Sequence, residues 1–295
     1  MKNTKMKNTR ILITGSNGLI GRNLYKHLVK EGYHVRGIDL QNSDYNMDLS
    51  DLNEIDRTIL EDAIIHTDVV FHLAAQVGVD LCHNKGTMII SQEIDNNLFP
   101  LFEKYKPKVI YPSSSEVYGS NKKHVKETDD FKILNKSTGY SAQKLASEFL
   151  IRHYNFPFTI VRFFNVIGPG QSAENGFVIP RFIDSAITDK PLDVFQKNST
   201  RAFMDIRDCV QVLEKLIHKD VDTVNIGNPD NLVTMKKLAK IVKKITKSNS
   251  KINILSKRNE EIKYRVPDTT RMLKLMYPWK PKYSLKDTIK WIINE

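Results

Sequence analysis

The feature that constrains this chain most is a glycine-rich turn between an apolar strand and a helix. Residues 11–13 are apolar, and residues 19–30 show the spacing of an amphipathic helix. The glycines recur at every third residue, unlike the Gly-x-Gly-x-x-Gly of the common dinucleotide fingerprint. A tight turn and a close approach to phosphate both favour residues without Cβ, and a helix N-terminus attracts anions. We therefore predict that a dinucleotide binds at Gly15, Ser16, Asn17, Gly18, Leu19, Ile20 and Gly21.

Asp39 is expected to select the form of that dinucleotide. It ends a predicted strand, residues 33–39, about 20 residues beyond the turn, where an acid can bind the adenosine ribose hydroxyls. A carboxylate there repels a 2′-phosphate, and no cation follows it at Leu40 or Gln41. The sequence therefore predicts NAD rather than NADP. The alternative is an acid that only forms a turn at the end of the strand.

Strands and helices alternate along the first half of the chain. Predicted strands separated by helical patterns cover residues 11–13, 33–39, 69–73, 108–111 and 159–164. This alternation predicts an α/β fold with a Rossmann-type, doubly wound parallel sheet. After Asn165, glycines and prolines interrupt the pattern. We expect an NAD-binding domain over residues 1–165 and a smaller α/β substrate-binding domain over residues 166–295, with elements near residues 205–226 returning to the sheet.

Composition excludes several other classes of protein. The chain has 295 residues, of which 40% are hydrophobic, enough for one large domain or two unequal ones. Two cysteines, Cys82 and Cys209, cannot form a disulfide framework or a Cys-rich metal site, and we predict no metal. No run approaches the ~18 apolar residues of a membrane span, and the polar N-terminus lacks a signal peptide's apolar stretch. We expect a cytoplasmic protein that does not bind membranes.

The formal net charge is +11. A basic surface can bind nucleic acid or attract a diphosphate substrate. The lysines are densest over residues 236–257, where Leu238, Ile241, Val242 and Ile245 recur at helical spacing. This spacing favours a solvated helix face, so we do not expect nucleic acid as a partner.

Tyr140 and Lys144 are candidate catalytic residues at the start of a predicted helix. A separation of four places the phenol and the ammonium on one helix face. A free tyrosine has a pKa near 10, but a neighbouring ammonium and a cationic nicotinamide ring favour the phenolate. The phenol can then act as a base near neutral pH. The alternative is an aromatic residue and a charge that share a helix surface by chance.

Hydroxyl groups gather after the predicted strand at residues 108–111. Ser113, Ser114 and Ser115 follow it, and the carboxyl ends of strands in doubly wound sheets are where ligands bind. We therefore expect these hydroxyls to lie in the site, although a Ser-rich turn would read the same way.

These segments together resemble the extended short-chain dehydrogenase/reductase family of nucleotide-sugar epimerases, dehydratases and decarboxylases. The resemblance covers nearly the whole chain. The matching segments are residues 14–21, Asp39, Asp48-Leu49, residues 71–76, 113–119, 140–144, 162–165, 201–203, 225–229 and 265–268. The resemblance implies NAD as cofactor, a nucleotide-sugar as substrate, most of all a UDP-sugar, and a homodimer formed by pairing helices.

The resemblance also implies roles for single residues. Tyr140 takes the proton from the sugar O4 while hydride passes from C4 to NAD, Ser114 holds O4, and Lys144 holds the nicotinamide ribose and tunes Tyr140. Further cofactor contacts are implied for Asp48, Leu49, Leu73, Ala74 and Ala75. Substrate contacts are implied for Gln76, Asn165, Arg181, Arg201 and Arg265, and an Arg fork suits phosphate.

Glu116 bears on the step that follows the 4-keto sugar. Simple 4-epimerases usually carry a small or uncharged residue at this place, whereas decarboxylases and dehydratases carry Glu. Many dehydratases have Asp before that Glu, where this chain has Ser115, although the GDP-mannose type also has Ser. Residues 265–268, Arg-Val-Pro-Asp, resemble the Arg-Lys-Pro-Asp of UDP-glucuronate decarboxylases. Arg265 can pair with a glucuronate carboxylate or with the diphosphate.

We therefore expect a UDP-glucuronate decarboxylase first, a UDP-hexose 4-epimerase second and a nucleotide-sugar 4,6-dehydratase third. A different class, a non-catalytic NAD-binding or nucleic-acid-binding protein of the same fold, is disfavoured because Ser114, Tyr140 and Lys144 are all present. Two segments depart from the family pattern. Residues 93–97 lack its Asn-x-x-Gly-Thr, and Gly139 stands before Tyr140 where Pro is common.

Overall fold

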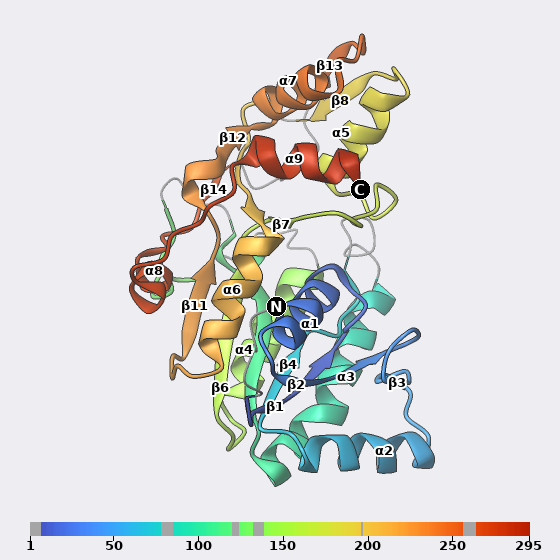
Figure 1. Ribbon diagram of the computed structural model, residues 1–295, viewed down its shortest axis with the longest axis vertical. Coiled ribbons are helices and arrows are strands. Elements are labelled where there is room, and N and C mark those ends of the chain that lie inside the picture. Colours follow the sequence, from blue (N-terminus) through green and yellow to red (C-terminus); the bar gives the residue numbers. More distant parts are fainter. Residues whose placement is uncertain (1–6, 78–84, 120–123, 132–138, 196, 256–263) are drawn as a thin grey trace.

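The computed structural model describes residues 7–77, 85–119, 124–131, 139–195, 197–255 and 264–295, so Cys82 and Lys257 lie outside it. A central sheet is formed by β1 (Arg10–Thr14), β2 (His34–Asp39), β3 (Tyr45–Asn46), β4 (Val69–His72), β5 (Lys108–Ser114), β6 (Phe158–Phe163) and β11 (Thr223–Ile226). The strands lie in the order β11-β6-β5-β4-β1-β2-β3, and every pairing is parallel (Figure 1). The predicted Rossmann-type parallel sheet is confirmed.

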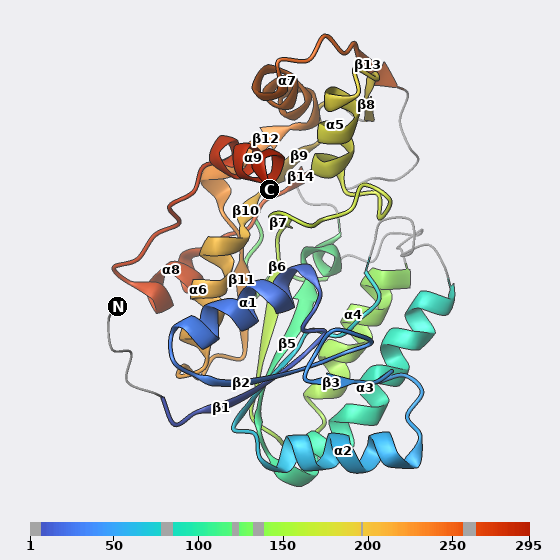
Figure 2. The same ribbon diagram turned by 45° about the vertical axis from the view of Figure 1, so that its right-hand side comes forward.

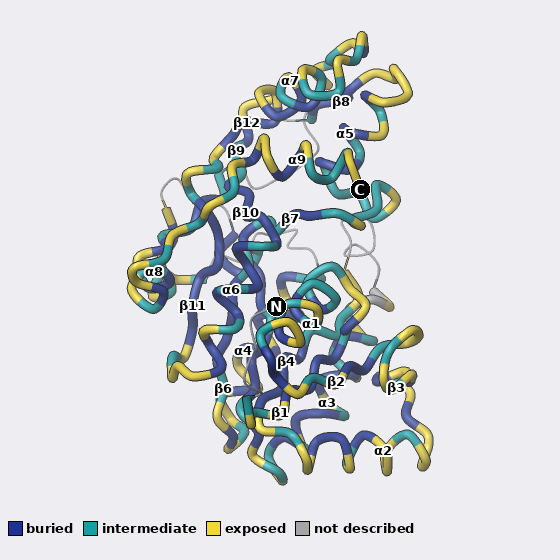
Figure 3. Tube along the Cα trace, viewed as in Figure 1, coloured by how far each residue is buried: buried dark blue, intermediate teal, exposed yellow. Residues whose placement is uncertain are grey.

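Helices cover both faces of this sheet (Figure 2). One face carries α1 (Leu19–Lys30), α6 (Ile206–Leu216) and α8 (Thr270–Met276), and the other carries α2 (Glu54–Ile65), α3 (Lys85–Tyr105) and α4 (Gly139–Ile151). On the first face Leu24 and Leu28 pack in one cluster with Leu213. On the second face Leu98 and Phe102 pack in another. Because both faces are covered, the central strands are buried along their length (Figure 3).

The rest of the chain builds a smaller layer beyond the carboxyl ends of the strands (Figure 1). Its helices are α5 (Val178–Ile187), α7 (Met235–Thr246) and α9 (Leu285–Asn294), which share an apolar cluster. Its strands are β7 (Val166–Ile167), β8 (Leu192–Phe195), β9 (Thr200–Ala202), β10 (Met204–Asp205), β12 (Leu232–Thr234), β13 (Ile252–Leu255) and β14 (Tyr264–Arg265). They form the small sheets β10-β7, β12-β9-β14 and β13-β8.

The chain passes between the two parts more than once. After β10, α6 packs against α1, and β11 then pairs with β6 and forms one edge of the sheet. The pairing of β14 with β9 places Arg265 directly opposite Arg201. The main sheet and the smaller layer therefore both contribute walls to the space between them. None of the helices in the described ranges is long and apolar enough to cross a membrane.

Candidate active site

A cavity of about 1020 Å³ lies between the carboxyl ends of the strands and the smaller layer. Every predicted site residue except Ser16 lines this cavity. The Ser16 side chain instead makes a hydrogen bond of 2.6 Å with the Ser43 hydroxyl. Residues from widely separated segments therefore converge as the sequence predicts, while the roles assigned to them stay predictions.

The glycine turn presents bare backbone to the cavity. Gly15 has a φ of +68°, and a Cβ on it would lie 2.8 Å from the Ala74 backbone nitrogen. A Cβ on Gly21 would lie 2.1 Å from the Gly15 carbonyl oxygen. Neither position tolerates a side chain, so the turn can hold the start of α1 close to a bound diphosphate.

Asp39 is fixed beside this turn at the end of β2. Its carboxylate accepts hydrogen bonds of 2.8 Å from the backbone N–H groups of Asn17 and Leu40. An ionised carboxylate has about four acceptor positions, so two are left for ribose hydroxyls. The glycine turn and Asp39 together fit the pyrophosphate and the adenosine ribose of NAD.

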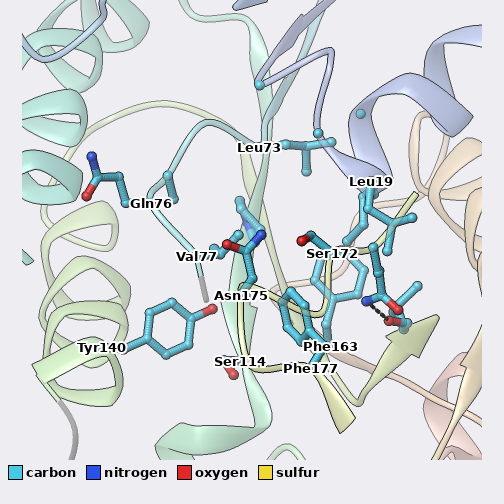
Figure 4. A pocket seen from close by; sticks show the side chains of 18 of the residues that line it. Leu19, Leu73, Gln76, Val77, Ser114, Tyr140, Phe163, Ser172, Asn175 and Phe177 are labelled. Carbon is cyan, nitrogen blue, oxygen red and sulfur yellow. Dashed lines mark hydrogen bonds between the residues drawn. The ribbon is translucent and has the colours of Figure 1, made fainter. Parts of the chain in front are cut away.

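Tyr140 and Lys144 lie on the first two turns of α4. Figure 4 shows Tyr140 extending from this helix toward the middle of the cavity, where Asn175 also lies. The Lys144 side chain is buried, and its Nζ is 5.0 Å from the centre of the Tyr111 ring, in cation–π geometry. The packing of this turn of the helix therefore fixes where the ammonium lies.

The glycine at position 139, where the family pattern commonly has Pro, can be explained by the packing around it. A Cβ at this position would lie 1.8 Å from the sulfur of Met88 on α3. Because α3 packs so closely on the start of α4, the residue before Tyr140 has no room for a side chain unless Met88 moves.

Ser114, Ser115 and Glu116 stand where β5 ends. Ser114 caps a short 3-10 helix, η2 (Ser115–Tyr118), and its hydroxyl accepts the Glu116 N–H at 3.2 Å. Ser114 appears at the cavity wall below Tyr140 in Figure 4. Glu116 is half-buried and forms an ion pair of 2.5 Å with Arg265 Nη2. This ion pair joins two predicted site residues from opposite ends of the chain.

A buried polar network supports this strand end from below. Arg162 forms a two-bonded ion pair with Glu148, at 2.9 and 2.6 Å, and also donates to the Tyr118 hydroxyl at 2.8 Å. Tyr118 in turn donates to Asn225 at 2.7 Å, since burial raises the pKa of Tyr118 to about 12 and keeps the phenol protonated. Ser113 donates to Glu148. The network fixes η2 and β11 together under the site.

Gln76 follows β4 of the main sheet, whereas Asn165, Arg181, Arg201 and Arg265 lie on the smaller layer or at its border. The Arg181 guanidinium packs over the Phe195 ring, 5.5 Å from its centre. Asn165 adopts a φ of +41° and donates from its amide to the Ala202 carbonyl at 3.0 Å. The Nε of Arg265 is buried and has no hydrogen-bond partner among the described residues. Arg181, Arg201 and Arg265 all line the cavity.

Sequence reasoning missed part of the cavity wall. Ser172, Asn175 and Phe177 come from the loop before α5 (Figure 4), and Arg22 of α1 donates to the Pro169 carbonyl of the same loop at 2.6 Å. The only signal in the sequence was the break in periodicity around residues 168–176. No motif spacing pointed to Arg22, because its partner lies far along the chain.

Comparison with known proteins places these features in a family. Residues 11–227 match the model of the NAD dependent epimerase/dehydratase family. A UDP-N-acetyl-alpha-D-glucosaminuronate decarboxylase of Bacillus cytotoxicus is 33% identical, over 96% of this chain and 97% of that protein. UDP-glucuronic acid decarboxylase 4 of Arabidopsis thaliana is 26% identical, over 99% of this chain and 69% of that protein.

Solved structures agree with these relatives. The UDP-glucuronic acid 4-epimerase of Bacillus cereus, in complex with UDP-glucuronic acid and NAD, has a TM-score of 0.84 at 27% identity. The match covers 97% of this chain and 98% of that one. The family resemblance and the NAD cofactor expected from the sequence are both confirmed. This chain belongs to the NAD dependent epimerase/dehydratase family.

Proposed function

We propose that this protein is an NAD-dependent enzyme that decarboxylates a UDP-linked hexuronic acid, of which UDP-glucuronate is the first candidate. The observation that carries the proposal is the Glu116–Arg265 ion pair inside the cavity, next to the strand end that bears Ser114. An arginine there can receive the substrate's carboxylate, and the glutamate lies beside the carbons that react. Decarboxylases among the relatives support the same reading.

The residues of the chain then act in sequence on the sugar. NAD, when bound, supplies the oxidant for C4 and returns the electrons at the end. Tyr140 takes the O4 proton, Ser114 holds O4, and Lys144 favours the Tyr140 phenolate. The C5 carboxylate of the 4-keto sugar is that of a β-keto acid. The C5–CO₂ bond breaks, its electron pair passes into the C4 carbonyl as an enolate, and a proton returns to C5.

In this scheme Arg265 holds the carboxylate of the incoming sugar. Glu116 stands near C5, where it can guide the returning proton. A buried pair of opposite charges limits the cost of desolvating each ion before the substrate arrives. Asn165, Arg181 and Arg201 are assigned to the nucleotide diphosphate, because cations and an amide that line the cavity suit it.

The second candidate is 4-epimerisation of a UDP-hexose or UDP-glucuronate. The match to a UDP-glucuronic acid 4-epimerase favours it. Both reactions begin with the same 4-keto sugar, and they separate when CO₂ is lost or retained. In an epimerase the ketone is reduced from its other face and the C5 substituent is retained, and Arg265 meets a carboxylate only when the substrate is UDP-glucuronate.

We also propose a homodimer and keep the division into domains at residue 165. Helices α3 and α4 lie side by side on one face of the sheet (Figure 2) and expose Ile89 and Phe149, which are 57% and 53% accessible. Pairing this face with its copy would cover both side chains. A cytoplasmic location stays a prediction.

A panel of nucleotide-sugars tests the reaction type. The protein is incubated with NAD and, in turn, with UDP-glucuronate, UDP-glucose, dTDP-glucose and GDP-mannose. The products are identified by mass and, because C4 epimers have the same mass, also by proton NMR. Loss of CO₂ from UDP-glucuronate alone is the expected result. Loss of water from any sugar, or a C4 epimer of unchanged mass as the sole product, contradicts the proposal.

A further inference from the structure

Asp95 is a buried carboxylate under the active site that none of the steps above uses. It lies on α3, is 2% accessible and is absent from the cavity wall. Its oxygens accept hydrogen bonds from His72 at 3.0 Å, Tyr111 at 2.9 Å, Gln143 at 3.3 Å and also from Ser147. These four donors come from β4, β5 and α4, so one side chain ties together three elements that form the site.

The hydrogen bonds around Asp95 continue through His72 to Thr14. His72 Nε2 faces the carboxylate and must donate, which leaves Nδ1 of the neutral ring as an acceptor. The Thr14 hydroxyl lies 2.8 Å from Nδ1 and donates to it. The same hydroxyl accepts the Ala74 N–H at 3.1 Å. A chain of hydrogen bonds therefore runs from Ala74 through Thr14 and His72 to Asp95.

The first arm of the network ends at the cofactor wall. Ala74 lines the cavity, and its backbone nitrogen is the atom that a Cβ on Gly15 would approach to 2.8 Å. The hydrogen bond from Ala74 to Thr14 thus holds the end of β4 against the glycine turn. Loss of Asp95 would remove the acceptor that orients His72 and, through it, the Thr14 hydroxyl.

The second arm ends at the catalytic helix. Tyr111 donates to Asp95 and offers the face of its ring to Lys144 Nζ, 5.0 Å from its centre. Burial, followed by the Asp95 charge, raises the pKa of Tyr111 well above its ordinary value, so the phenol remains a donor. Gln143 and Ser147, which flank Lys144 on α4, donate to the same carboxylate.

We propose that Asp95 is a positioning residue that fixes the Ala74 backbone at the cofactor wall and the Tyr111 ring beneath Lys144 at the same time. The proposal rests on the proposed function in one respect: the proposed function gives Lys144 the role of favouring the Tyr140 phenolate. Asp95 lies in the segment, residues 93–97, that departs from the family pattern. Here the departure supplies a four-donor anchor.

The test compares Asp95→Asn with Asp208→Asn in the full-length protein. Asp208 is as buried, accepts the backbone N–H groups of Lys282 and Tyr283, and does not line the cavity. NADH affinity is measured by fluorescence titration, UDP affinity by calorimetry, and turnover at saturating NAD. Because Asn cannot accept from all four donors, Asp95→Asn should weaken NADH binding and lower turnover about tenfold each. UDP affinity should stay within about twofold of the wild type, because Asp95 contacts none of the residues assigned to the nucleotide diphosphate.

The control should lose a similar amount of thermal stability but keep NADH affinity. If Asp95→Asn leaves NADH affinity and turnover at the level of Asp208→Asn, the carboxylate is only structural and the proposal fails. If Asp95→Asn does not fold, two near-isosteric variants at its hydrogen-bond partners test the proposal instead. Thr14→Val should weaken NADH binding, and Tyr111→Phe should lower turnover about fivefold while NADH affinity stays. Unchanged values in both would overturn the proposal.

NADH titration needs no sugar chemistry, so this test stays separate from that of the proposed function. If the wild type turns over no nucleotide-sugar, the reaction assigned above is wrong, and NADH affinity of Asp95→Asn and Thr14→Val alone then decides whether Asp95 positions the cofactor wall.

Discussion

Arg265 Nη2 lies 2.5 Å from Glu116 Oε1, and both side chains line the cavity, so the cation and the acid that we assign to the substrate are in direct contact. The Nε of Arg265 is buried and has no partner among the described side chains and backbone groups. The ion pair with Glu116 therefore fixes where the Arg265 guanidinium lies in the cavity.

The first prediction concerns this ion pair. Arg265→Ala should weaken UDP-glucuronate binding about tenfold or more, since a charge-assisted two-bonded contact contributes roughly 1.5–3 kcal/mol. UDP-glucose, which has no carboxylate, should lose much less affinity. Both dissociation constants are measured by calorimetry. Equal losses for the two ligands would show that Arg265 binds the diphosphate instead.

Glu116→Gln is the matched change on the other partner. It should slow CO₂ release or C5 protonation more than the first oxidation, so that NADH or a 4-keto sugar accumulates in single turnover. Absorbance at the NADH band follows this directly. Turnover close to that of the wild type would remove Glu116 from the reaction.

Tyr140→Phe should lower turnover by about 10²–10⁴ because it removes the general base and keeps the ring. UDP affinity should remain near that of the wild type, which calorimetry checks. Turnover that survives this substitution would mean that another group takes the O4 proton.

Asp39→Ala should weaken NAD binding and narrow the difference between NAD and NADP. The lost carboxylate removes the acceptor for the ribose hydroxyls and the charge that repels a 2′-phosphate. Fluorescence titrations with NADH and NADPH give both constants. A wild type that prefers NADPH would contradict the role of Asp39.

The ion pairs of Glu214 with His27 and Lys7, which do not line the cavity, should make the stability of the fold depend on pH. Although burial opposes ionisation, hydrogen bonds from His27 and Lys7 lower the pKa of Glu214 from 4.5 to about 2. A lowered pKa stabilises the fold above the unfolded pKa, and this contribution is lost as pH falls from about 4.5 toward 2. Urea unfolding at pH 7 should show Glu214→Gln less stable than the wild type, and the difference should shrink by pH 3. A constant difference would contradict this linkage.

Local signals predicted the sheet well. The helix at residues 19–30 occurs with the predicted bounds, because apolar spacing and the glycine turn are local features. The strand predicted to end at Tyr111 continues to Ser114, since its serines pair with β6 in register. Polar residues that follow a predicted strand can still belong to it when a neighbouring strand forms hydrogen bonds with their backbone groups.

Pairings between residues far apart in the chain could not be predicted from the sequence. Strands as short as β9 and β14 have no periodicity to detect, yet their register sets Arg201 opposite Arg265. The contact of Arg265 with Glu116 and the four donors around Asp95 also join distant segments. Residue types and motif order indicated which side chains enter the site, but which of them meet is decided by tertiary packing.

Release of CO₂ from UDP-glucuronate labelled at the carboxyl carbon tests the central claim most directly. Purified protein with NAD should release labelled CO₂ and form the matching UDP-pentose, and Tyr140→Phe should reduce the release by about 10²-fold or more. If label remains in the nucleotide-sugar while UDP-glucuronate equilibrates with its C4 epimer, the protein is an epimerase and the assignment of decarboxylation is wrong.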